Sequence, residues 1–169
     1  GILGAGALGV MYGQLLQQAL GRDQTFFIAD ARRTARYQRE GLYCNGAYCD
    51  FRYLSARHAQ PVDLLLVAVK FPTLENALAE AQSFVHPGTI FLSVMNGIAS
   101  EERISQIFGR EHLLYCIVHG MDTGKQGNKI QYEHLGTVVF GARENHRTED
   151  AAAGAELVDT AGIPSDIPA

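Results

Sequence analysis

The stretch Gly4-Ala5-Gly6-Ala7-Leu8-Gly9 decides how the rest of the chain is interpreted. It follows residues 1–3, which have the composition of a strand, and precedes residues 10–20, whose apolar spacing predicts a helix. A G-x-G-x-x-G pattern between a strand and a helix is typical of a loop that binds the pyrophosphate of a dinucleotide. Asp30 comes 21 positions after Gly9, close to the ~20 expected for an acidic residue that binds the ribose.

The three glycines of this stretch have separate expected roles. Gly4 permits the tight turn, Gly6 lets the backbone approach the pyrophosphate, and Gly9 lets the helix pack close to the strand. The free N–H groups at the helix start then attract the phosphates. We therefore predict that Gly4, Ala5, Gly6, Ala7, Leu8 and Gly9 bind a nicotinamide cofactor. The alternative is a glycine-rich turn that only joins two core elements.

The identity of the dinucleotide depends on the residues after the second predicted strand. A carboxylate at Asp30 favours NAD, because it accepts hydrogen bonds from the ribose and repels a 2′-phosphate. Arg32 and Arg33 follow at once, and either could pair with the 2′-phosphate of NADP. Asp30, Arg32 and Arg33 are all predicted cofactor-binding residues, and the sequence leaves NADP and NAD open.

The remaining elements alternate between strands and helices. Strands are predicted at 25–29, 63–69, 89–94 and 113–118, and helices at 31–40, 72–85, 100–108 (capped by Ser100) and 148–161. A hairpin around Asn45-Gly46 is predicted over 42–54, and an antiparallel pair, 129–135 with 137–140, at one sheet edge. The fold class is α/β: a Rossmann-type, doubly wound, mostly parallel sheet with an antiparallel edge.

Three further polar residues follow predicted parallel strands. Lys70 comes directly after 63–69, Asn96 closely follows 89–94, and His119 follows 113–118. Because functional loops gather at the carboxyl ends of parallel strands, we predict cofactor and catalytic roles for Lys70 and Asn96. His119 is a weaker candidate for substrate contact. The alternatives are a solvated loop lysine and a turn asparagine; His134 is expected to be a structural edge residue, and Asp122 receives no role.

The bulk composition narrows the classes of protein. The chain has 169 residues, 47% of them hydrophobic, which suffices for one domain over 1–169. A net charge of −4 argues against nucleic-acid binding, and no apolar run is long enough to span a membrane. Cys44, Cys49 and Cys116 lack C-x-x-C spacing, so no metal site is expected. We expect a reducing, cytoplasmic location for the protein.

Three segments together resemble the N-terminal NADP-binding domain of the ketopantoate reductase (2-dehydropantoate 2-reductase) family. They are Gly4–Gly9, Ala68-Val69-Lys70-Phe71 and Met95-Asn96-Gly97-Ile98, and the resemblance covers nearly the whole chain. It implies NAD(P)H-dependent reduction of ketopantoate, a small 2-keto acid, to D-pantoate in pantothenate biosynthesis. It also implies that Lys70 contacts cofactor and active site, and Asn96 cofactor and substrate. One departure is Asp30, where the family commonly has an arginine that serves the 2′-phosphate.

The resemblance further implies a helical C-terminal domain, which is absent from this chain. Its main catalytic lysine is expected beyond Ala169, so we expect a domain truncated at both ends, and an isolated fragment that binds cofactor weakly without turnover. A homodimer of the full-length protein is compatible with this interpretation. Two alternatives stay open: a dehydrogenase of the 6-phosphogluconate or glycerol-3-phosphate type, and a nucleotide-sensing module without enzymatic activity.

Overall fold

The computed structural model describes residues 1–141 and 148–167 of the chain. Its helices are α1 (Ala7–Leu20), α2 (Ala31–Glu40), α3 (Leu74–Ala81), α4 (Ala99–Phe108) and α5 (Thr148–Thr160). Its strands are β1 (Ile2–Leu3), β2 (Phe26–Ile28), β3 (Tyr43–Cys44), β4 (Ala47–Tyr48), β5 (Arg52–Leu54), β6 (Leu64–Val67), β7 (Ile90–Ser93), β8 (Leu113–Met121), β9 (Gly124–Gln126), β10 (Lys129–Gln131), β11 (Leu135–Gly141) and β12 (Ser165–Asp166).

The main sheet has the strand order β12-β11-β8-β7-β6-β1-β2-β5. Within this order, the six strands β8, β7, β6, β1, β2 and β5 run parallel to one another. On its other side, β8 pairs antiparallel with β11. The chain reverses its direction of travel across the sheet between β1 and β6. Open α/β sheets commonly bind their ligands at such a point, beside the carboxyl ends of the strands. The predicted α/β class, with a mostly parallel sheet and an antiparallel edge, is confirmed.

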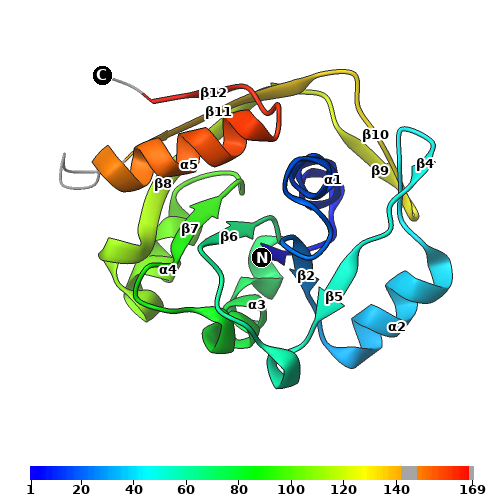
Figure 1. Ribbon diagram of the computed structural model, residues 1–169, viewed down its shortest axis with the longest axis horizontal. Helices are drawn as coiled ribbons and strands as arrows, with labels where there is room; N and C mark the ends of the chain where they lie inside the picture. Colours follow the sequence, from blue (N-terminus) through cyan, green and yellow to red (C-terminus); the bar gives the residue numbers. More distant parts are fainter. Residues whose placement is uncertain (142–147, 168–169) are drawn as a thin grey trace.

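Helices cover both faces of this sheet, with α1 and α5 on one side and α3 and α4 on the other (Figure 1). Successive strand residues accordingly enter different cores. Ile2 packs in the cluster with α1, whereas its neighbour Leu3 packs in the cluster with α3. Phe91 and Leu92 divide between the clusters in the same way. Continuous apolar runs are what a parallel strand buried on both faces requires.

Close packing of α1 against the first two strands fixes the position of the glycine-rich loop, residues 4–9. A Cβ on Gly13 would lie 2.9 Å from side-chain carbons of both Ile2 and Phe27, so α1 approaches the sheet more closely than an alanine permits. Tyr12 anchors the same helix from its other side, where its hydroxyl donates to the carbonyl of Leu135 at 2.9 Å. The loop is therefore held between a buried strand and a tightly packed helix.

A second, smaller sheet with the order β4-β3-β10-β9 corrects two of the predictions. The Asn45-Gly46 hairpin is confirmed, with φ of 48° and 82° at its two turn residues, but it ends at β4. The rest of the predicted 42–54 hairpin forms β5, which pairs with β2 in the main sheet. Residues 52–54 belong to the main sheet and not to the hairpin, because Tyr53 packs against the apolar core beside Phe27.

The predicted antiparallel pairing of 129–135 with 137–140 is wrong. β10 pairs with β9 and β3 in the small sheet, whereas β11 pairs with β8. Gly136 does not separate two strands but lies inside β11, where Leu135 and Thr137 pair with Met121 and His119. The alternation around Ile130 has a different cause, because Ile130 is fully buried in the core next to α1.

Two helix predictions are refined. The helix predicted over 72–85 contains a regular α-helix only at α3, with a 3₁₀ turn on either side. Ser100 lies inside α4 and does not cap it, since its hydroxyl contacts Ser93 and Glu101. Within the described residues, every helix is too short or too polar to span a lipid bilayer.

Candidate functional site

The glycine-rich loop, Lys70 and Asn96 lie at one edge of the main sheet. The loop leaves the carboxyl end of β1, Lys70 follows β6, and Asn96 follows β7, and these three strands are neighbours and parallel. Gly4 contacts Ala68, two residues before Lys70, so the loop and the lysine segment are packed together. The structure thus brings the main predicted site residues to a single edge.

Gly4 and Gly9 are required by packing inside the loop itself. A Cβ on Gly9 would lie 1.9 Å from the carbonyl oxygen of Gly4, and a Cβ on Gly4 would lie 2.6 Å from that of Ala68. Gly4 also has φ +98°, a conformation that side chains rarely adopt. Any larger residue at either position would force the backbone apart.

Gly6 differs, because the space around it is open. Within residues 1–141 and 148–167, a Cβ there would meet only the carbonyl oxygen of Ala68, at 3.6 Å. The φ of −80° at Gly6 is ordinary for any residue. Gly6 is the N-cap of α1 and offers no side-chain hydrogen bond to the helix start. The first helical bond runs from the N–H of Val10 to Gly6, so the preceding helical N–H groups have no intrahelical partner. This open, positively polarised position fits a diphosphate.

Asp30 and Arg33 interact with each other at the start of α2. The Asp30 carboxylate caps the helix by accepting from the N–H of Arg33 at 2.7 Å, and it also accepts from Arg33 Nε at 3.0 Å. These contacts, the backbone hydrogen bond first, lower the pKa of Asp30. Arg33 additionally donates to Glu80 on α3. Arg32 is exposed, so of the two predicted arginines it is the freer to meet a ligand.

Lys70 and Asn96 are both exposed, in the loops that follow β6 and β7. Thr73 holds the Lys70 carbonyl through both its N–H and its hydroxyl, each at 2.9 Å. Beneath Asn96 the hydroxyls of Ser93 and Ser100 lie 2.8 Å apart, and Ser100 donates to the buried Glu101 at 2.6 Å. Thr73 therefore holds the backbone of Lys70, and both predicted site residues are exposed.

His119 lies within a strand, not after one as predicted. β8 continues to Met121, and His119 stands opposite Thr137 of β11 with its side chain exposed. β8 runs parallel to β7, but only Leu113 and Leu114 pair with it, so the rest of β8 extends past the edge where Asn96 lies. A substrate role for His119 stays a prediction.

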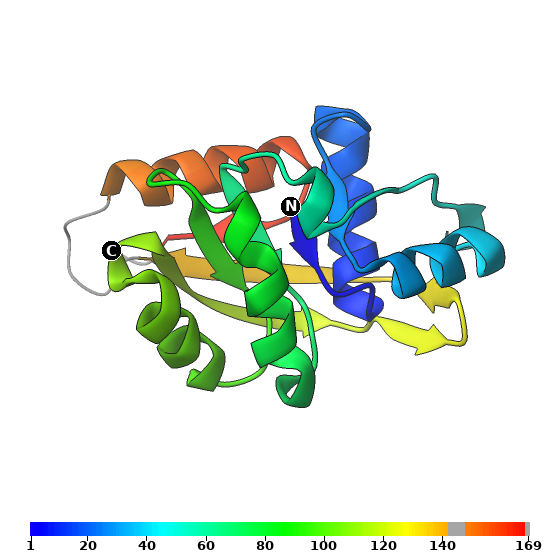
Figure 2. The same cartoon turned by 90° about the horizontal axis from the view of Figure 1, so that it is seen from below.

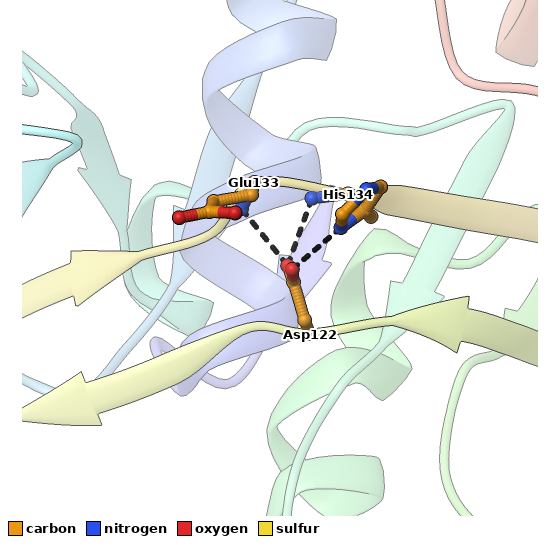
Figure 3. Close-up of side chains that lie close together, drawn as sticks. All are labelled: Asp122, Glu133 and His134. Atoms are coloured by element: carbon orange, nitrogen blue, oxygen red, sulfur yellow. Dashed lines mark hydrogen bonds and ion pairs between the residues drawn. The ribbon is translucent and has the colours of Figure 1, made fainter.

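Asp122, Glu133 and His134 form a polar cluster just beyond β8 (Figure 3). One Asp122 carboxylate oxygen accepts from the N–H groups of Glu133 and His134 at 2.9 and 2.8 Å, and the other lies 2.7 Å from His134 Nδ1. The backbone hydrogen bond from His134 is the main cause that lowers the pKa of Asp122 to about 2, while Asp122 raises that of His134. Since the Asp122 oxygens are already engaged and all three side chains are exposed, we assign a structural role: Asp122 ties the end of β8 to the start of β11.

Lys125 was not predicted from the sequence. It lies on β9, and its ammonium donates to the carbonyl of Ala5 in the glycine-rich loop at 2.6 Å. The two residues are 120 positions apart in the sequence. The polar sequence around Lys125 indicates only an ordinary hairpin at a sheet edge. Only the path of the small sheet brings this lysine to the loop.

Comparisons with known proteins agree with this geometry. A 2-dehydropantoate 2-reductase from Pyrococcus horikoshii is 27% identical over 173 residues, covering 98% of this chain and 54% of that protein. The 2-dehydropantoate 2-reductase structure from Porphyromonas gingivalis superposes with a TM-score of 0.79 at 22% identity, covering 99% of this chain and 62% of the other. A D-mandelate dehydrogenase solved with NADH and anilino(oxo)acetate gives 0.82 at 22% identity, covering 99% and 56%.

The two structural likenesses show the fold alone. The chain spans about half the length of the curated relative that it matches. The model of the family described as ketopantoate reductase PanE/ApbA matches residues 1–145, most of the chain, including the glycine-rich loop, Lys70 and Asn96. The chain belongs to the ketopantoate reductase PanE/ApbA family.

Proposed function

We propose that this chain binds a nicotinamide dinucleotide for the reduction of a small 2-keto acid, with 2-dehydropantoate as the first candidate. The observation that carries the proposal is the convergence of the open Gly6, Lys70 and Asn96 at one edge of the sheet. Gly6 and the free N–H groups of α1 would hold the diphosphate. The family supplies the substrate class.

Two residues of this chain fit binding roles in such a reaction. Lys70 offers a cation for a phosphate or a substrate carboxylate, and Asn96 offers an amide that can orient the ribose or the substrate. The bound nicotinamide would supply the hydride. We propose that the proton donor comes from the part of the relatives that this chain does not span, so this chain provides binding and orientation.

We propose NADPH as the preferred dinucleotide, with NADH as the alternative. Asp30 would repel a 2′-phosphate if its charge were free, but Arg33 already pairs with it. Arg32 is exposed one residue earlier and carries the charge that a 2′-phosphate needs. The capped Asp30 and the exposed Arg32 together make the ribose end of the site suitable for NADPH.

Fluorescence titration with NADPH and NADH tests this proposal. We expect NADPH to bind more tightly, and Arg32→Ala to weaken NADPH by about tenfold, or about 1.4 kcal/mol, with little effect on NADH. The matched control is Arg39→Ala, an exposed arginine at the other end of the same helix. Tighter binding of NADH, or equal effects of Arg32→Ala on both nucleotides, would contradict the preference for NADPH.

A second candidate is oxidoreduction of another 2-hydroxy acid. The observation that favours it is the likeness to D-mandelate dehydrogenase, which has the same fold over 99% of this chain. Titration of the chain, with a nicotinamide dinucleotide bound, with 2-dehydropantoate and with phenylglyoxylate, the keto acid of mandelate, separates the two candidates by their affinities. Homodimer formation also stays a prediction, which analytical ultracentrifugation would check.

A further inference from the structure

We propose that Lys125, reaching over from the small sheet, is a binding residue for the cofactor diphosphate. This inference rests on the proposed dinucleotide function and adds to it a residue from outside the Rossmann strands. Its starting point is the contact between the Lys125 ammonium and the Ala5 carbonyl, at 2.6 Å. The ammonium is thereby placed at the glycine-rich loop, one residue from the open Gly6.

The small sheet holds Lys125 in this place by several independent contacts. In the β9–β10 pairing, Lys125 stands opposite Ile130, which is fully buried in the core beside α1. Asn128, in the turn between these strands, donates to the Glu40 carbonyl at the end of α2 at 2.7 Å, and accepts from the N–H of Tyr43 at 3.0 Å. Figure 2 shows the β9–β10 hairpin beside the first turn of α1. The backbone of Lys125 is therefore fixed against the loop.

Other positively charged side chains lie near the Lys125 ammonium. Burial is the largest cause that lowers the pKa of Lys125. The nearby cations Arg36 on α2 and Lys70 after β6 lower this pKa further. Lys70 and Lys125, two of the three lysines of the chain, thus lie close enough for their charges to interact beside this loop. Among the side chains that the structure describes, no carboxylate forms an ion pair with Lys125 or Lys70. Like charges gathered without a counterion repel each other, and an anionic ligand between them removes that cost.

The hydrogen-bonding capacity of Lys125 suits the same ligand. An ammonium has three donors, and among the described residues Lys125 donates only to Ala5. The others are available for phosphate oxygens, which carry a full charge and form stronger hydrogen bonds than a neutral carbonyl. The diphosphate would then lie between the N–H groups of α1 and two lysines, Lys70 and Lys125.

Replacement of Lys125 by methionine tests the proposal, with Lys129→Met as the matched control. Lys129 is an exposed lysine on the neighbouring strand β10, so both variants remove one charge from the same small sheet. We expect Lys125→Met to weaken NADH and NADPH by the same factor, about tenfold, and Lys129→Met to leave both dissociation constants within about twofold. Lys125→Arg, which keeps the charge, should retain most of the affinity.

The dependence of binding on salt gives a second readout. With Lys125 present the dissociation constants should rise with NaCl concentration, and in Lys125→Met this rise should be smaller, because one cation fewer is screened. Unchanged affinity in Lys125→Met, or a loss confined to NADPH, would overturn the assignment to the diphosphate. A wild-type protein that binds neither nucleotide would instead overturn the proposed function itself, and the inference with it.

Discussion

In the proposed dinucleotide site, the glycine-rich loop and the small sheet that contacts it contribute by opposite means. The loop consists of six consecutive residues and works through missing side chains: Gly9 has no room for a Cβ beside Gly4, whereas Gly6 leaves its space open. The small sheet works through one long charged side chain, Lys125, whose strand is held by distant partners. The comparison shows that a local backbone shape and a long-range charge are separate components, which substitutions can separate.

The largest expected effect comes from Gly9→Ala, which breaks the loop itself. Its Cβ would lie 1.9 Å from the Gly4 carbonyl oxygen, and neither backbone segment can move without disturbing β1 or α1. Such overpacking costs about 3 kcal/mol, which lowers the melting temperature by roughly 6–12 °C. We expect nucleotide binding to be lost together with this stability, as calorimetry and titration would show.

Gly6→Ala is the matched variant within the same loop. Its Cβ has room in the protein alone, so the melting temperature should stay within about 1 °C. Binding of both nucleotides should weaken by at least about tenfold, because the new methyl group occupies the place of the diphosphate. A destabilised Gly6→Ala, or one that binds normally, would show that the two glycines do not have different roles.

A smaller effect is expected at the strand ends. Lys70→Ala and Asn96→Ala remove exposed side chains, so the folded protein should keep its melting temperature. Lys70→Ala should weaken the nucleotides by about tenfold and Asn96→Ala by about threefold, as expected for a charged and a neutral hydrogen bond. Lys129→Ala serves as the control for lost charge; equal effects of Lys70→Ala and Lys129→Ala would remove Lys70 from the site.

Much of the fold, and the placing of part of the candidate site at one sheet edge, were predictable from the sequence for a physical reason. The main strands bury both faces, so their apolar runs mark them locally, and the glycine pattern, Lys70 and Asn96 follow from strand positions. The pairings of β5, β10 and β11 were not predictable, because short strands choose partners by tertiary packing. Lys125 was missed for the same reason: nothing near it in the sequence indicates Ala5.

The smallest expected effect concerns the tie between Asp122 and His134. In Asp122→Asn the pKa of His134, measured by NMR titration, should return toward the ordinary value of 6.5. In the wild type the tie is complete between pH 3.8, the ordinary pKa of an aspartate, and pH 6.5, and it weakens as the pH rises through the raised pKa of His134. At the acid end it is lost as the pH falls through about 2, where Asp122 is protonated.

Hydrogen exchange of the Glu133 and His134 amides provides the control for this prediction. Both N–H groups donate to Asp122, so they should exchange faster in Asp122→Asn, while nucleotide affinity should not change. A marked loss of affinity would show that the cluster belongs to the binding site and does not act only as a tie.

The most direct test of the central claim is an NMR titration that follows backbone amides as NADPH is added. The account predicts that the largest shifts fall on Gly6, Ala7 and Leu8 at the start of α1, with further shifts at Lys70 and Lys125. Shifts of this size confined to residues away from the carboxyl ends of β1 and β6, or no shifts at saturating NADPH, would contradict it.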